Sequence, residues 1–290
     1  MLDEFLKNEL SFDRESGTYL FYGDDVERNF ELALEFAKHL FSKNIKDLKN
    51  IESIKQKVDR QTYSDLYVID NLNIDIARDM IKKSYSSSHE GNAKVFILKN
   101  IQDIRKESAN AILKIIEEPT KDNFFILLSK HLNILTTIRS RSIIYRVKRA
   151  TAEELGVDKY SYEFFLASST DIKKFKQSSI NLSEEVSFKS IGKFIKAYET
   201  EEKIEEKVNI YKALRDFVIK SENLKLYEKI KFAEDINSNI TNRENVKLVV
   251  DYLINLVKRN KNLKGKLYLK KMLRYPVNLK LFFINLILEI

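Results

Sequence analysis

The chain has 290 residues, of which 43% are hydrophobic and 32% charged, as is typical of a folded protein rather than a disordered one. It has no cysteine, which excludes disulfides and thiolate zinc sites. Its histidines, His39, His89 and His131, lie far apart in sequence, so we expect no metal site. No apolar run approaches the roughly 18 residues that span a bilayer, and the N-terminus is acidic, unlike a secretory signal. We therefore expect a cytoplasmic protein without membrane contact.

The formal net charge is +8, which favours binding to nucleic acid. The lysines are, however, interleaved with glutamate and aspartate, as on an ordinary solvated surface, and the composition is rich in lysine, asparagine and isoleucine throughout. The run from Lys258 to Arg274 contains eight basic residues and no acid. We interpret it as a solvated or intersubunit face.

The first half alternates short apolar runs with amphipathic stretches. Strands are predicted at 19–22, 66–69, 95–98, 124–128 and 143–147. Helices are predicted at 26–41, 74–85 and about 105–118, the last of them ended by Pro119. Alternating strands and helices predict a parallel sheet covered on both faces.

After about residue 150 the sequence predicts helices alone. Short helices are expected over 153–178, with a polar joint near 168–171, and long amphipathic helices from about 191 to the end. Two apolar stripes stand out, one from Val208 to Val218 and one from Val246 to Val257. Both stripes are apolar enough to require partners that cover them.

The strand at 19–22 ends at Gly23, where a phosphate-binding loop with the pattern G-x-x-x-x-G-K-[ST] would begin. The second glycine of that pattern is replaced by Arg28, the lysine by Asn29 and the hydroxyl residue by Phe30. Three acids add negative charge where a triphosphate would lie: Asp24, Asp25 and Glu27. The loop is predicted not to bind ATP in the usual way, unless this segment was never such a loop.

The strand at 95–98 would carry the acids that hold magnesium at its end. It runs instead into Lys99 and Asn100. Phosphate and metal binding are thus lost together, which predicts a subunit without nucleotide chemistry of its own.

Two blocks near residue 120 form a specific pattern. Residues 108–119 read S-A-N-A-I-L-K-I-I-E-E-P, and residues 135–142 read L-T-T-I-R-S-R-S. They resemble the A-N-A-L-L-K-x-L-E-E-P helix and the L-x-x-T-I-R-S-R-C block of the AAA+ clamp-loader subunits of bacterial DNA polymerase III, most closely the delta-prime type. Residues 19–23, 33–40 and 88–97 are similar to other parts of the same core.

The resemblance implies three domains. They are an α/β AAA+-like domain with a five-stranded parallel sheet (1–149), a small helical lid (150–190) and an all-α collar that mediates oligomerisation (191–290). In such a collar we expect the two apolar stripes to be buried against sister subunits of a ring. The four-cysteine zinc module that the family often carries is absent from 42–62, and Ser142 replaces the cysteine of S-R-C. The lost phosphate loop favours delta prime over the motor subunit.

The resemblance also implies that Arg141, flanked by Ser140 and Ser142, is an arginine finger that faces ATP bound by the adjacent motor subunit. ATP and magnesium would be bound by that neighbour, and this chain would need no cofactor. The expected partners are the gamma/tau motor subunits, the delta subunit, the sliding clamp and primed DNA. The alternative for Arg141 is an ion pair with a nearby carboxylate of its own chain.

The remaining candidates have lesser roles. Ser129 occupies the sensor position and is expected to be structural, and Glu117 and Glu118 are interpreted as helix-end surface. Residues expected to touch DNA phosphate lie near one helix start: Arg105, Lys106, Ser108 and Asn110. Rival functions are a divergent motor ATPase and a stand-alone DNA-binding regulator.

Overall fold

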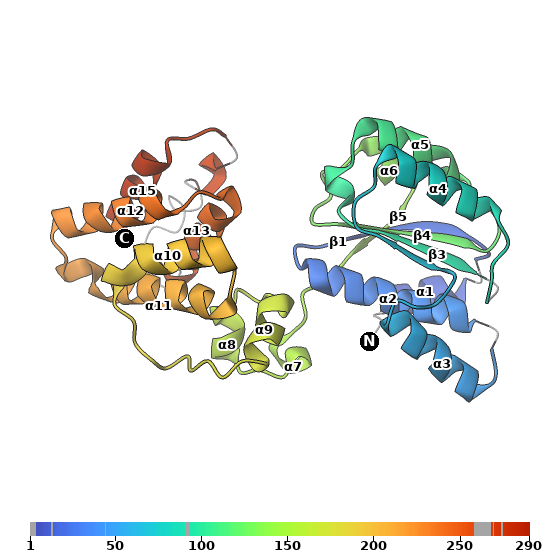
Figure 1. Ribbon diagram of the computed structural model, residues 1–290, viewed down its shortest axis with the longest axis horizontal. Helices are drawn as coiled ribbons and strands as arrows, with labels where there is room; N and C mark the ends of the chain where they lie inside the picture. The colour runs from blue at the N-terminus through green and yellow to red at the C-terminus, as the bar shows by residue number, and fades with distance from the viewer. Residues whose placement is uncertain are drawn as a thin grey trace. The chain divides into compact units, whose positions relative to one another are not determined.

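The computed structural model describes residues 4–12, 14–43, 45–90, 93–257, 268, 270–273 and 275–290. The chain divides into two compact units, Met1–Thr151 and Ala152–Ile290 (Figure 1). Within the second unit, Phe164, Phe165 and Ile172 of the expected lid share one hydrophobic core with the helices after residue 191. The separation of 150–190 from 191–290 therefore stays a prediction.

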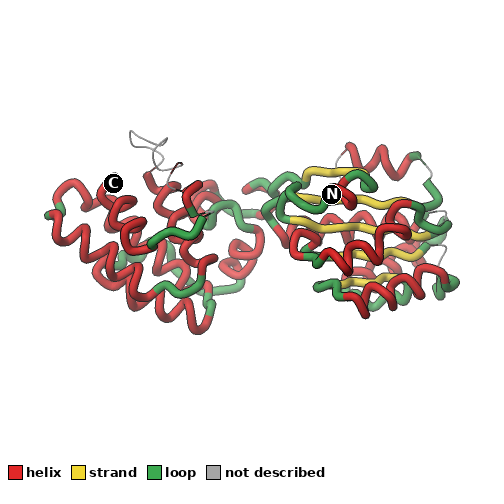
Figure 2. Tube along the Cα trace, turned by 90° about the horizontal axis from the view of Figure 1, so that it is seen from above, coloured by secondary structure: helices red, strands yellow, loops and turns green. Residues whose placement is uncertain are grey.

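The first unit contains the five-stranded parallel sheet that the sequence predicts, in the order β2-β3-β4-β1-β5. Figure 2 shows the strands side by side with helices on both sides of the sheet. The strands match the apolar runs to within a residue or two: β1 Gly17–Tyr22, β2 Leu66–Ile69, β3 Lys94–Leu98, β4 Asn123–Ser129 and β5 Ile143–Arg146.

Helices cover each face of this sheet over a separate hydrophobic core (Figure 1). One face carries α1 (Glu4–Ser11), α2 (Val26–Ser42) and α3 (Leu48–Asp59). The other carries α4 (Ile74–Tyr85), α5 (Lys106–Glu117) and α6 (Thr136–Arg139), with the short 3₁₀ helix η1 (Ile101–Asp103) after β3. Alternate strand residues supply the two cores, so Phe21 faces α2 while Phe96 stacks on Phe125 on the opposite face.

Helix α3 was not predicted, and it lies where the family's zinc module would be. Ile54 and Val58 are buried in the core beneath it. Lys38 of α2 forms an ion pair with Asp59, the last residue of α3, at 2.6 Å. This segment is thus an ordinary amphipathic helix held by apolar contacts and an ion pair.

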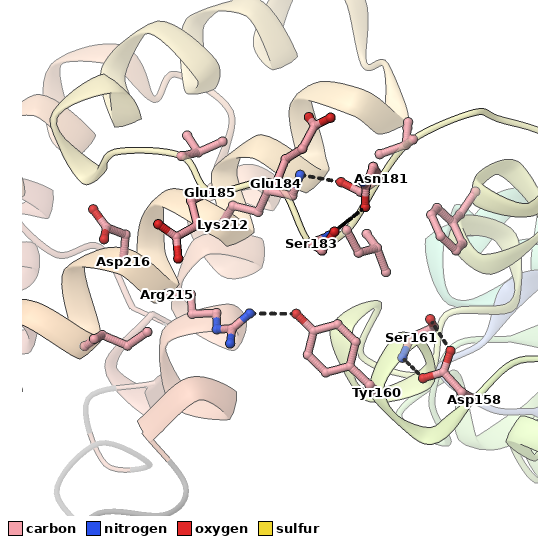
Figure 3. A pocket seen from close by; sticks show the side chains of 15 residues that line it. Asp158, Tyr160, Ser161, Asn181, Ser183, Glu184, Glu185, Lys212, Arg215 and Asp216 are labelled. Carbon is pink, nitrogen blue, oxygen red and sulfur yellow. Dashed lines mark hydrogen bonds between the residues drawn. The ribbon is translucent and has the colours of Figure 1, made fainter.

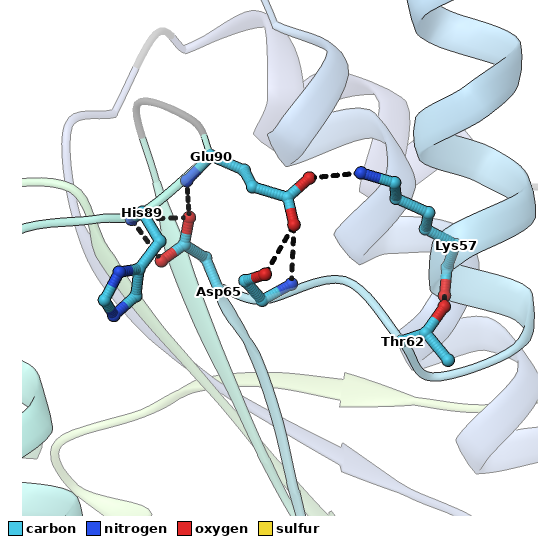
Figure 4. A network of polar contacts seen from close by, with 6 residues as sticks. Lys57, Thr62, Asp65, His89 and Glu90 are labelled. Atoms are coloured by element: carbon cyan, nitrogen blue, oxygen red, sulfur yellow. Dashed lines mark hydrogen bonds and ion pairs between the residues drawn. The ribbon is translucent and has the colours of Figure 1, made fainter.

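A polar network ties α3 to the segment that precedes β3 (Figure 4). The buried carboxylate of Asp65 accepts hydrogen bonds from the backbone N–H groups of His89 and Glu90 at 2.8–3.0 Å. Glu90 in turn pairs with Lys57 at 2.5 Å and accepts from the hydroxyl of Ser64. This network fixes residues 88–90 of the block that resembles the family, whereas Gly91 and Asn92 of that block lie outside the described residues.

All the regular secondary structure in the described residues of the second unit is helical, as predicted. Its elements are α7 Ala152–Leu155, α8 Lys159–Phe164, α9 Ser169–Lys176, η2 Phe188–Ser190, α10 Ile191–Glu201, α11 Ile204–Lys220, η3 Ser221–Asn223, α12 Leu226–Asn239, α13 Arg243–Val257 and α15 Leu279–Leu288. No helix in the described part of either unit has the length and apolar character needed to cross a bilayer.

The expectation that the two apolar stripes bury against sister subunits is wrong. Val208 and Leu214 on α11, like Val246 and Leu253 on α13, are fully buried in this chain's own core. The reason is that α10–α13 and α15 pack on one another and cover both stripes. Most of the basic run from Lys258 to Arg274 lies outside the described residues.

Candidate functional site

The strand order brings the segments with the altered nucleotide-binding residues together. Strands β3, β4 and β1 are neighbours, and parallel strands end at the same edge of a sheet. Gly23 follows β1, Lys99 follows β3, and Ser129 ends β4. The backbone N–H of Gly23 donates to the carbonyl of Ser129 at 3.0 Å, which joins the ends of β1 and β4.

Asn29, which replaces the phosphate-binding lysine, is turned inward at this edge. It is only 2% exposed. Its Nδ2 donates to the carbonyls of Gly23, at 2.7 Å, and Ser129, at 3.1 Å. The side chain thus ties the loop to the ends of two strands, where a P-loop lysine would point at phosphate. The carbonyl of Ser129 accepts from Asn29 and from the N–H of Gly23, and the Ser129 hydroxyl donates to the carbonyl of His131.

Phe30 and Lys99 close the space between α2 and the end of β3. The ammonium of Lys99 lies 3.9 Å from the centroid of the Phe30 ring and pairs with Asp70 at 2.8 Å. Together with Asn29 and Asn100 they line a cavity of about 70 Å³. Small-molecule sites usually have about 300–1,000 Å³. This cavity is therefore smaller than a usual small-molecule site.

The N-terminus of α2, which would bind a triphosphate, is capped by the chain itself. The Asp25 carboxylate accepts from the N–H of Arg28 at 3.2 Å. Asp24 is held by both Nε and Nη2 of Arg149, at 2.9 and 2.5 Å. The negative charge expected from the sequence is present, and at Asp24 it is neutralised by an arginine that follows β5.

The Asp24–Arg149 pair predicts a pH-dependent effect on stability. The hydrogen bond from Arg149 holds the pKa of the Asp24 carboxyl below its usual value. A lowered pKa in the folded state adds stability above the unfolded pKa, and this contribution is lost as the pH falls through the folded pKa. We expect Asp24→Asn to lower the urea midpoint slightly at pH 7 and by less at pH 3, since the contribution fades as the pH falls and both residues are largely exposed. An equal loss at both values would show that the pair does not act through charge.

The strand β3 ends without the acids that bind magnesium. Asn100 adopts a left-handed backbone conformation with φ of 55°, which asparagine tolerates better than most residues. Its side-chain amide donates to the carbonyl of Asp70 at 3.3 Å. Among the described residues, no group of three histidine or acidic side chains is arranged to hold a metal ion.

Arg141 lies just after α6, on the face of the sheet that carries α5. Its Nε donates to Oε2 of Glu117, the last residue of α5, at 2.7 Å. Its Nη1 donates to the carbonyl of Thr137 at 3.0 Å. Nη2 makes no hydrogen bond within the described part of the chain, and the side chain remains 28% exposed. The ion pair that was the alternative reading is therefore present, yet it engages only part of the guanidinium.

The serines that flank Arg141 shape its turn. Ser140 Oγ donates to the carbonyl of Thr137 at 3.2 Å, and Ser142 Oγ donates to that of Ile138 at 2.9 Å. A hydroxyl at position 142 thus bonds to the backbone of the same turn. Glu117 was read from the sequence as helix-end surface, and its contact with Arg141 was missed because the two residues are 24 positions apart.

The residues predicted to contact DNA are not equally exposed. Arg105, Lys106 and Asn110 lie at the surface, whereas Ser108 is only 2% exposed and packs inside. Arg105 also lines a cavity of about 600 Å³ that reaches Lys99 and Asn71. Any contact of this helix start with phosphate therefore depends on Arg105, Lys106 and Asn110.

A cavity of about 690 Å³ lies within the second unit (Figure 3). The guanidinium of Arg215 points to the Tyr160 hydroxyl, at 2.8 Å, and Lys212 donates to the carbonyl of Asn181 at 2.7 Å. The lining also includes acids, among them Glu184 and Asp216. This mixture of charges favours no single class of ligand.

The first unit is an α/β domain with a parallel sheet, and its own side chains pack around the ends of β1, β3 and β4. The profile of a protein family described as "DNA polymerase III, delta subunit" matches residues 2–151, just over half of the chain. The chain belongs to this family, and it is of the delta-prime type, as its relatives indicate.

Three relatives are delta-prime subunits of DNA polymerase III. The chain is 25% identical over 196 residues to that of Buchnera aphidicola subsp. Acyrthosiphon pisum, covering 61% of this chain and 57% of the relative. It is 28% identical over 151 residues to that of Bacillus subtilis, covering 48% and 44%. It is 35% identical over 72 residues to that of Yersinia pestis, covering 24% and 21%. The matches thus span less than two thirds of these relatives' length.

One solved structure has a similar fold across the whole chain. It is a DNA polymerase III, gamma subunit-related protein from Thermotoga maritima, with a TM-score of 0.59 and 20% identity. The similarity covers 99% of this chain and 97% of that protein. At 20% identity, this similarity supports a shared fold and nothing about function.

Proposed function

We propose that this chain is a non-catalytic subunit of a DNA polymerase III clamp loader that donates Arg141 in trans to ATP bound by an adjacent motor subunit. Phosphoryl transfer spreads negative charge over the γ-phosphate oxygens, and a guanidinium neutralises that charge in the transition state. The role is that of a rigid support whose own site needs neither ATP nor magnesium.

One observation carries this proposal: the chain's own phosphate site is filled by its own side chains. Asn29, Phe30 and Lys99 reduce it to about 70 Å³. Family membership then supports a place in the assembly, and the partly free guanidinium of Arg141 supports a contribution to a neighbour's site.

The partners follow from the same proposal. They are the gamma/tau motor subunits and the delta subunit, with the sliding clamp and primed DNA reached through the assembled complex. Arg105, Lys106 and Asn110 are the residues of this chain that we propose to face the DNA backbone. Their substitution is expected to weaken DNA binding by the complex and to reduce its salt dependence.

An ATP-binding measurement on the isolated chain tests the filled site. We expect no saturable binding of Mg–ATP by calorimetry up to millimolar nucleotide, because the phosphate position is occupied by Asn29 and the helix N-terminus by Asp25. A motor subunit with an intact phosphate loop serves as the positive control. Saturable, magnesium-dependent binding at micromolar ATP would favour a divergent motor ATPase instead.

A further inference from the structure

We propose that Glu117 is a positioning residue for Arg141: its carboxylate holds the Nε of the guanidinium so that Nη2 stays available for the neighbour's phosphate. This inference rests on the function proposed above. It concerns which group of this chain orients the arginine, a role that the sequence did not indicate.

Both ends of the Glu117–Arg141 pair stand on a fixed support. Ile116, next to Glu117, and Ile138, three residues before Arg141, are fully buried in the same hydrophobic core. Pro119 prevents α5 from continuing, so Glu117 lies at the helix end with its side chain at the surface. The distance of 2.7 Å thus joins two side chains whose backbones are both held by close packing.

The hydrogen bonds fix the plane of the guanidinium. Nε is bound by Glu117 and Nη1 by the carbonyl of Thr137, which comes from a different element. Because the group is planar, two anchors of different direction determine its orientation. Neither anchor uses Nη2, which is free to donate to a phosphate oxygen.

The same geometry distinguishes positioning from inhibition. A carboxylate that sequestered the arginine would bind Nη2 as well, and it would have to be displaced before the arginine could reach a phosphate. Glu117 accepts a hydrogen bond from Nε, and Nη2 makes none within the described part of the chain. A phosphate can therefore meet Nη2 while the ion pair remains in place.

The test measures single-turnover ATP hydrolysis in the reconstituted complex with clamp and primed DNA, for Glu117→Ala, Glu117→Gln and Arg141→Ala. We expect Glu117→Ala to lower the single-turnover rate constant at the adjacent site roughly 10- to 100-fold while ATP binding by that site stays unchanged, because a misplaced guanidinium costs transition-state stabilisation. Glu117→Gln keeps an acceptor for Nε and should restore much of the loss. The double variant Glu117→Ala/Arg141→Ala should be no slower than Arg141→Ala alone, because Glu117 acts only through Arg141.

Glu118→Ala is the matched control. Glu118 is the next residue and is exposed, and its substitution removes the same negative charge. Glu118→Ala should leave the single-turnover rate constant unchanged, and thermal unfolding of Glu117→Ala should shift by about 4 °C at most. Wild-type or faster turnover of Glu117→Ala, beside a slow Arg141→Ala, would overturn the positioning role alone. An Arg141→Ala complex that turns over normally would overturn the proposed function and this role with it.

Discussion

Arg141→Ala is expected to slow ATP hydrolysis at the adjacent motor site by about 10³-fold while the complex still assembles. An arginine finger supplied in trans acts on charge that develops only in the transition state, so ATP binding by the neighbour should change little. Arg141 makes a single ion pair at the surface, and its loss should cost little stability. Single-turnover hydrolysis measures the effect, because other sites in a ring would mask it in steady state.

Two variants make this measurement specific. Arg139→Ala removes the same charge two residues earlier, from an exposed position, and should leave the rate near wild type. Arg141→Lys keeps the charge but loses the planar fork, and should recover only part of the rate. If Arg139→Ala and Arg141→Ala lowered the rate equally, the effect would come from positive surface charge in general and not from the Arg141 guanidinium in particular.

Lys94→Met is expected to lower the free energy of unfolding of the first unit by about 3 kcal/mol. Lys94 is 3% exposed at the start of β3. Its ammonium donates to the carbonyls of Lys83, at 2.8 Å, of Ser84, at 3.0 Å, and of Ser86, which lie at the end of α4. Burial lowers the pKa of Lys94, yet these acceptors at a helix C-terminus favour a cation. Methionine keeps the length and leaves the carbonyls without this donor.

Chemical denaturation of the whole chain, followed by a probe in the first unit, measures this loss. Lys121→Met is the control, because Lys121 makes a surface pair with Glu15 and is 68% exposed. Its effect should stay below about 1 kcal/mol. Equal effects of the two substitutions would mean that the bonds of Lys94 to the end of α4 add no more than a surface ion pair.

The sheet could be predicted from the sequence because it depends on local signals. Continuous apolar runs such as 124–128 are long enough for a buried strand, and Gly23 and Pro119 mark where elements end. The prediction missed α1 and α3, whose inward faces are short. Helix α3 is otherwise polar and buries only Ile54 and Val58, so few apolar residues mark it in the sequence although tertiary packing holds it.

The residues of the candidate site could be named from the sequence, but their arrangement in space could not. The sequence identified Asn29, Phe30 and Lys99 as separate departures from a nucleotide site. That they meet in one small cavity depends on the strand order, which no local pattern contains. The burial of the apolar stripes inside the chain was missed for a related reason. An amphipathic helix shows that it needs a partner and does not show whether the partner is its own chain.

A structure of the assembled complex with an ATP analogue tests the trans role of Arg141 most directly. The account predicts that a guanidinium nitrogen of Arg141 lies about 3 Å from a γ-phosphate oxygen held by the adjacent subunit, with Glu117 still bound to Nε. An Arg141 that contacts only Glu117 and Thr137 while the nearest nucleotide lies at a different interface would contradict it.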